Sequence, residues 1–282
     1  MRLNMSISKG QKLFLFLFFA ISIIIIGFIQ YQEVLIKTIE RVHSEFIIAN
    51  INDYQKIEED SIIYHYNDEI DIENIQEIAS ITQEMVNQVN KNFAQEKKEA
   101  FNVVIYPNSM EMNSGLRLSS QERTLGAYYG GNIFLLSPTQ LNSSNTPIEN
   151  IILHEYTHLL VEKRTKGYHP IWFTEGVALY QEYLITGYEW GENYDYNNIP
   201  YTIGQLQNDF YHLDTFKAYR SSFLRVRFIT EIYGEEILLD IMNELGNGNS
   251  YEDSINNILG KNYKDLENNF MLWYESNFYD KL

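Results

Sequence analysis

The chain has no cysteine and few basic side chains. None of its 282 residues is Cys, and 21 Lys and Arg stand against 38 Asp and Glu, for a formal net charge of −17. Without Cys there is no disulfide framework and no thiolate metal site, which leaves His, Asp and Glu as candidate metal ligands. The negative charge would repel phosphate backbones, so we expect no nucleic-acid partner.

The first part of the sequence carries a long uncharged apolar run. Residues 13–29 read LFLFLFFAISIIIIGFI and follow Arg2, Lys9 and Lys12. The run is close to membrane-spanning length and no small-x-small cleavage site follows it, which favours an uncleaved signal anchor, with residues 1–12 as a cytoplasmic tail. A removed signal peptide is the alternative. We therefore expect a single-pass protein of the cell membrane whose main part is extracytoplasmic.

Residues 30–57 are predicted to form a stalk after this anchor. Four apolar residues recur at spacings of four and three, as in an amphipathic helix: Leu35, Ile39, Val42 and Phe46. The polar stretch INDYQKIEED, residues 51–60, reads as a break after the helix. Such a stripe indicates a core face or a partner face.

Residues 58–146 are predicted to form an α/β subdomain with a small mixed sheet. The pattern gives a strand, a helix, a strand and a hairpin, at 61–66, 72–93, 100–106, 124–129 and 132–137. Gly130 and Gly131 join the hairpin strands, because glycine tolerates positive φ at both turn positions.

Residues 147–282 are predicted to form a helical subdomain. The expected helices are 147–164, 170–185, 216–234, 235–245 and 263–279. A sheet with helices in the first half and helices alone in the second half makes an α+β fold.

The segment IILHEYTHLLVEKR contains two histidines about one helical turn apart. His154 and His158 are four residues apart, so on a helix their rings project from one face and can hold one ion. Glu155 stands beside this line, where a base acting on water at that ion would be. The alternative is an ordinary amphipathic helix with two satisfied histidines.

A third ligand is predicted in the segment IWFTEGVALYQEY. Apolar neighbours would pack this segment against the histidine helix: Trp172, Val177, Leu179 and Tyr180. Packing would deliver the Glu175 carboxylate, and a set of two His and one Glu leaves the fourth position of a tetrahedral zinc ion open to water, as in a catalytic site. A helix-starting carboxylate favoured by the helix dipole is the alternative for Glu175.

HEYTH followed by WFTEGVALY resembles the gluzincin zinc metallopeptidases, specifically the peptidase MA-like family related to the M1 aminopeptidases. Four positions match the W-x-x-E-G-x-A pattern of that family: Trp172, Glu175, Gly176 and Ala178. The order of elements over residues 60–280 is similar more weakly. The resemblance implies peptide-bond hydrolysis with Zn²⁺, with His154, His158 and Glu175 as ligands and Glu155 as general base.

The hairpin is predicted to contact the substrate. Its segment LGAYYGG lacks the acidic residue with which M1 enzymes hold a free amine, so the resemblance favours an endopeptidase over an aminopeptidase. An extended peptide could add to the strand NIFLLS as a sheet edge, although an ordinary sheet strand is an equal alternative. The residues expected to bind the peptide are Gly126, Tyr128, Asn132, Ile133 and Phe134.

A further donor is expected to stabilise the oxyanion of the reaction. Tyr219 is the first candidate, with His212 and His169 as alternatives, and a packing role for Tyr219 is equally open. The sequence thus predicts a membrane-anchored, extracytoplasmic zinc metallopeptidase acting on a peptide or protein. The alternative is a non-catalytic cell-surface binding module that keeps the same fold.

Overall fold

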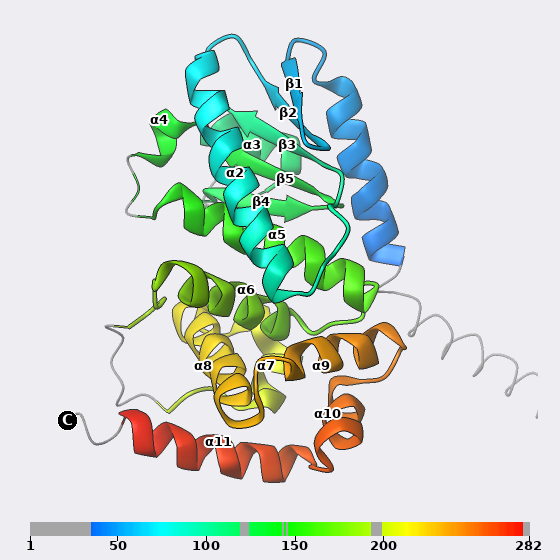
Figure 1. Cartoon of the computed structure of the whole chain (residues 1–282), viewed down its shortest axis with the longest axis vertical. Helices are drawn as coiled ribbons and strands as arrows, with labels where there is room; N and C mark the ends of the chain where they lie inside the picture. Colours follow the sequence, from blue (N-terminus) through cyan, green and yellow to red (C-terminus); the bar gives the residue numbers. More distant parts are fainter. Residues whose placement is uncertain (1–34, 119–123, 143, 145, 193–198, 279–282) are drawn as a thin grey trace, which may run out of the picture.

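The computed structural model describes the chain from residue 35 to residue 278, except for residues 119–123, 143, 145 and 193–198 (Figure 1). The predicted cytoplasmic tail and signal anchor, residues 1–12 and 13–29, lie outside this part. Among the residues that are described, no helix is both long enough and apolar enough to cross a membrane.

A five-stranded mixed sheet forms the upper half of the molecule in Figure 1, in the order β1-β2-β3-β5-β4. The strands are β1 (Gln55–Glu59), β2 (Ile62–Tyr66), β3 (Phe101–Tyr106), β4 (Gly126–Tyr129) and β5 (Asn132–Leu136). The strands β2, β3 and β5 run parallel, and the two edge strands run antiparallel to their neighbours. The predicted α+β class with a small mixed sheet is confirmed.

The prediction of a polar break at residues 51–60 is wrong, because strand β1 lies within it. Four of the five residues of β1 are exposed, so the strand has no apolar alternation that would indicate it. A tight turn joins it to β2, with Asp60 and Ser61 at φ values of +52° and +75°. An edge strand with two solvated faces leaves little trace in the sequence.

The predicted hairpin is present, but its strand at the edge of the sheet is β4 and not the predicted strand β5. Gly130 and Gly131 take the positive φ values that a two-residue turn requires, +57° and +90°. However, β5 pairs with β3 on its far side, which buries Asn132, Ile133 and Phe134 to exposures of 3%, 1% and 0%. The prediction that these three residues form a peptide-binding edge is therefore wrong, and the open edge belongs to β4.

Helices cover the sheet and build the lower half of the molecule. In the upper half they are α2 (Ile72–Asn92), α3 (Ser109–Leu116) and α4 (Pro138–Leu141). In the second half of the chain they are α5 (Ile148–Thr165), α6 (Ile171–Thr186), α7 (Ile203–Asp209), η1 (Phe210–His212), α8 (Thr215–Tyr233), α9 (Ile237–Gly246), α10 (Tyr251–Leu259) and α11 (Tyr263–Phe278). All five helices predicted for this half are confirmed, and α7 and α10 are additional. Helix α5 lies between the sheet and α6 and contacts both (Figure 1).

The helix of residues 35–50, drawn in blue in Figure 1, packs beside the sheet instead of projecting from it as a free stalk. Asn132 Nδ2 of β5 donates to Ser44 Oγ over 2.9 Å, and Ser44 is completely buried. Lys37 Nζ lies 3.4 Å from Glu162 Oε2 of α5. The helix is thus tied to both the sheet and the histidine helix.

Gly176 allows α6 and α8 to approach closely. A Cβ atom at Gly176 would lie 2.5 Å from the carbonyl oxygen of Ser222 in α8. We expect Gly176→Ala to lower the free energy of unfolding by about 1–3 kcal/mol, because overpacking must push the helices apart. Urea unfolding measures this. In the matched control Gly204→Ala, the nearest atom to the new Cβ is 3.9 Å away, so this variant should be neutral or more stable. Equal stabilities of the two variants would contradict the close contact.

Candidate metal centre

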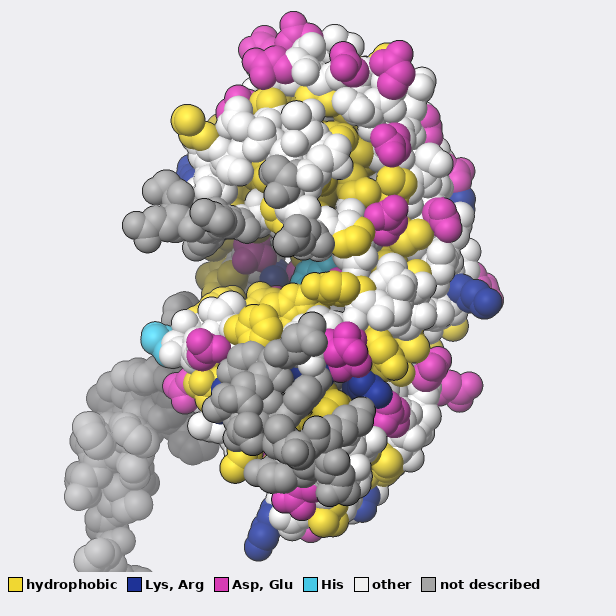
Figure 2. Space-filling model, turned by 90° about the vertical axis from the view of Figure 1, so that its left-hand side faces the viewer, with side chains coloured by type: hydrophobic (Ala, Val, Ile, Leu, Met, Phe, Trp, Pro, Cys, Tyr) yellow, Lys and Arg dark blue, Asp and Glu magenta, His cyan; other side chains and the backbone are white. Residues whose placement is uncertain are grey.

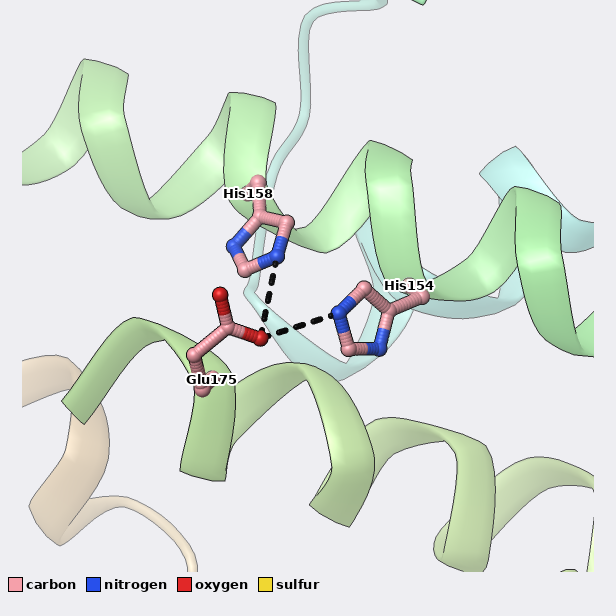
Figure 3. Close-up of side chains that lie close together, drawn as sticks. All are labelled: His154, His158 and Glu175. Atoms are coloured by element: carbon pink, nitrogen blue, oxygen red, sulfur yellow. Dashed lines mark hydrogen bonds and ion pairs between the residues drawn. The ribbon is translucent and has the colours of Figure 1, made fainter. Parts of the chain in front are cut away.

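Helices α5 and α6 bring His154, His158 and Glu175 together (Figure 3). Glu175 Oε2 lies 3.2 Å from His154 Nε2 and 3.6 Å from His158 Nε2. The three potential ligand atoms all lie within 4.8 Å of one another. The apolar residues of α6 that were predicted to deliver the carboxylate are buried at 0–4% exposure: Trp172, Val177, Leu179 and Tyr180. Helix packing therefore positions the carboxylate opposite the two rings.

The outer ring nitrogens are held by polar partners on α6. His154 Nδ1 lies 2.8 Å from Glu182 Oε1, and His158 Nδ1 lies 2.7 Å from Thr174 Oγ1. When Nδ1–H of His154 donates to Glu182, Nε2 carries a lone pair that faces the Glu175 carboxylate. Two such acceptors repel each other unless a cation or a proton lies between them. The donor set of two imidazoles and one carboxylate thus fits a divalent metal such as zinc.

The pKa values of the three groups reflect this crowding. Burial alone would lower the pKa of His154, but Glu175 and Glu182 together hold it well above its usual value. Burial lowers the pKa of His158 to about 4. Burial opposes ionisation of Glu175, yet His158 and His154 still hold the pKa of its carboxyl below the usual value. Without metal, a proton on His154 provides the positive charge that stabilises the Glu175 and Glu182 carboxylates on either side of the ring.

Glu155 lies beside the ligands, in contact with the edge strand β4. Its side chain is buried, and the backbone N–H of Tyr128 donates to its Oε2 over 2.6 Å. Burial raises the pKa of Glu155 to about 7, although the His154 charge and the Tyr128 hydrogen bond act against this rise. A carboxyl with a pKa near neutrality can both accept and release a proton during a reaction.

Glu182 is a site residue that the sequence interpretation missed. It accepts from His154 through Oε1, and its Oε2 accepts from Asn150 Nδ2 over 3.0 Å. Glu182 follows Glu175 by seven residues, which is two helical turns, so both carboxylates lie on the same face of α6. The spacing of these two carboxylates, the only acidic side chains in α6, was the available signal.

Replacing Glu182 should weaken metal binding without removing a ligand. We expect Glu182→Gln to lower zinc affinity by about 10–100-fold, because the variant keeps the shape of the side chain but loses the charge that fixes and polarises the His154 ring. Competition with a chromophoric chelator measures this affinity. The exposed Glu236→Gln is a control that should leave it unchanged. An unchanged affinity in Glu182→Gln would contradict the orienting role.

Tyr219 of α8 reaches the ligands, as a donor must. Its hydroxyl interacts with the Glu175 carboxylate, and burial raises its pKa, so the hydroxyl stays protonated and able to donate. Of the two alternatives, His169 is hydrogen-bonded to Thr165 Oγ1 over 2.7 Å, and burial lowers its pKa to about 3. The other, His212, is exposed in η1.

A pocket of about 260 Å³ opens beside the ligands. Figure 2 shows a hollow between the two halves of the molecule with histidine and acidic side chains inside it. His154, Glu155 and Tyr219 line the pocket together with Gly126 of β4. The wall exposes mainly apolar atoms, with Leu125, Ile151, Leu179 and Trp190 among its residues, although Glu182 and four other polar residues also line it. Of the residues predicted to bind a peptide, Gly126 borders the pocket and Tyr128 contacts Glu155.

A family model of the peptidase MA superfamily matches residues 81–276. The chain belongs to the peptidase MA superfamily. The match begins within α2 and ends within α11, so it includes α5, α6 and α8. The resemblance carried by HEYTH and WFTEGVALY is thereby confirmed at the level of the family.

Among solved structures, this peptidase MA superfamily member is similar to a mutant M1 zinc metallopeptidase from Deinococcus radiodurans. The two share 16% sequence identity with a TM-score of 0.49, and the match covers 76% of this chain and 48% of that chain. The chain thus spans about half the length of that enzyme. No curated protein matches the chain.

Proposed function

We propose that this chain is a zinc metallopeptidase, of endopeptidase type, that hydrolyses peptides or proteins outside the cytoplasm and is anchored in the membrane by residues 13–29. The observation that carries the catalytic part is the convergence of His154 and His158 Nε2 on one oxygen of Glu175, beside the buried Glu155. A structural site has no use for such a base next to the metal. The anchor is proposed from the uncharged run and the basic residues before it.

Each residue of the site has a role in this proposal. Bound zinc would supply a Lewis acid for the substrate carbonyl and would make the attacking water more acidic. Tyr128 N–H holds one oxygen of Glu155, and we assign the other oxygen to take the proton from water and pass it to the leaving amine. His154 and His158 remain neutral as ligands, each oriented through Nδ1.

The open edge of β4 offers a place for the peptide backbone. Leu136 N–H of the β4–β5 ladder donates to Leu125 O over 3.1 Å, so in the alternating antiparallel pattern Gly126 directs its N–H and C=O away from β5. An extended substrate can pair with these groups at the rim of the pocket. Because the pocket wall is mainly apolar, we expect an apolar substrate side chain next to the scissile bond.

Tyr219 is assigned to stabilise the oxyanion. We expect Tyr219→Phe to lower kcat by about 10²–10³-fold with little change in KM, because its hydroxyl would donate to charge that develops only in the transition state. The measurement is steady-state hydrolysis of a fluorogenic peptide. Tyr233→Phe, at the other end of the same helix, is the matched control. An unchanged kcat in Tyr219→Phe would return Tyr219 to a packing role.

The purified chain in detergent tests the proposed function. We expect about one zinc per chain by elemental analysis, cleavage of a peptide library with an apolar preference beside the cut, and loss of cleavage on chelation that zinc reverses. Zinc bound without cleavage of any peptide or protein would favour the binding module instead.

A further inference from the structure

The helix of residues 35–50 presents a row of exposed apolar side chains, which we call the apolar stripe. Its members are Leu35, Ile39, Val42 and Phe46, with exposed fractions between 52% and 65%. Single exposed apolar residues are common on protein surfaces, but four on one face of a helix form a patch of the kind that marks an interaction site.

The stripe lies opposite the face by which the helix is attached to the protein. At about 100° per residue, Ser44 lies roughly 160° around the helix from Val42 and from Phe46. Ser44 and Ile47 on the attached face are buried at 0% and 8% exposure. A Cβ at Gly130 would lie 2.4 Å from the backbone oxygen of Glu40, so the β4–β5 turn touches the helix backbone itself. The helix therefore cannot turn to bury its stripe.

We propose that the apolar stripe lies in the interfacial layer of the membrane that residues 13–29 enter. This inference rests on the proposed anchor. Only residues 30–34 separate the apolar run from the helix, and at about 3.3–3.6 Å per residue they span less than about 20 Å. The helix thus begins close to the bilayer surface, where an apolar helix face is buried about 5–10 Å deep.

A second copy of the chain fits the stripe less well. The residues Leu35, Ile39, Val42 and Phe46 span less than two heptads, whereas coiled coils sustain the pattern over about three to four. In a parallel pair the flanking positions would be Ile36, Thr38, His43, Glu45 and Asn50, which provide no pair of opposite charges. Lipid requires neither length nor matched charges.

Membrane contact along this helix would also orient the metal centre. Lys37 is paired with Glu162, which lies one helical turn beyond His158 on α5. This contact connects the helix of the stripe directly to the helix that carries the histidines, and the contact between Ser44 and Asn132 connects it to the sheet against which that helix packs. The pocket would then sit at a fixed height above the bilayer, which favours the membrane-proximal segments of other proteins as substrates.

Single-cysteine variants of the full chain test the inference, since the chain has no cysteine of its own. Val42→Cys reports the stripe, Ser22→Cys reports the anchor, and Leu272→Cys, at a 66% exposed position of α11, is the aqueous control. Each variant is labelled with an environment-sensitive fluorophore and reconstituted in phosphatidylcholine–phosphatidylglycerol vesicles. The vesicles contain lipids with a quencher at either a shallow or a deep position.

We expect the shallow lipid quencher to reduce the fluorescence at position 42 several-fold more than at position 272, and the deep quencher to act at position 22. Quenching at 22 with none at 42 would overturn the stripe inference and leave the anchor standing. Quenching at neither position would remove the anchor and the stripe inference together. Disulfide-linked dimers of Val42→Cys, without lipid quenching at that position, would assign the stripe to a second copy and overturn contact with lipid.

Discussion

Glu155→Gln is expected to lower kcat/KM for peptide hydrolysis by about 10²–10⁴-fold while zinc remains bound. The amide keeps the size of the side chain and can still accept the Tyr128 N–H, but it cannot take a proton from water. Glu155 supplies no ligand atom to the His154, His158 and Glu175 cluster, so the metal should be unaffected. Hydrolysis of a fluorogenic peptide and zinc analysis of the same preparation measure the two properties together.

The matched control for this variant is Glu149→Gln, in the first turn of the same helix. It removes one carboxylate from α5 outside the metal cluster and should leave hydrolysis unchanged. If Glu155→Gln cleaves peptides as fast as the wild type, another group is the base. If it loses zinc as well, the separation between ligands and base in this site is wrong.

The sequence predicted the three converging side chains because helical spacing fixes them locally. His154 and His158 share a face of α5 through their four-residue spacing alone, and the apolar residues around Glu175 required α6 to be buried. The role of Glu182 was not predicted, because it depends on how α5 and α6 pack against each other. That packing brings Glu182 Oε1 to 2.8 Å from His154 Nδ1. Periodicity within one helix contains no information on that relation.

Two errors in the sheet have a related cause. The sequence of β5 indicates a strand correctly. However, the order of the strands depends on the parallel pairing of β3 with β5, and the residues within and next to a strand do not specify which other strand it pairs with. Strand β1 has no apolar face to detect. Likewise, the spacing of Leu35, Ile39, Val42 and Phe46 predicted which residues share a face, but it could not indicate that this face points away from the protein.

Glu175→Gln should remove tight zinc binding and, with it, the stabilisation that zinc provides. The variant loses the only charged ligand of the cluster, so we expect zinc affinity to fall by more than the roughly 10–100-fold expected for an outer partner such as Glu182. Zinc at about a thousand times its dissociation constant stabilises the wild-type fold by about 4 kcal/mol, because it binds the folded chain only. Thermal unfolding with and without zinc should therefore show a large rise in Tm for the wild type and little rise for Glu175→Gln.

Glu182→Gln separates this result from a general loss of stability. It alters a carboxylate on the same face of α6, yet it leaves all three ligand atoms in place, so its Tm should still rise with zinc, to an extent between those of the other two proteins. An equal zinc-dependent rise in Glu175→Gln and the wild type would mean that the metal takes its carboxylate from elsewhere. Glu175 would then serve the packing of α6 against α5 and not the metal, because the two imidazoles fill only half of a tetrahedral site and need another carboxylate to complete it.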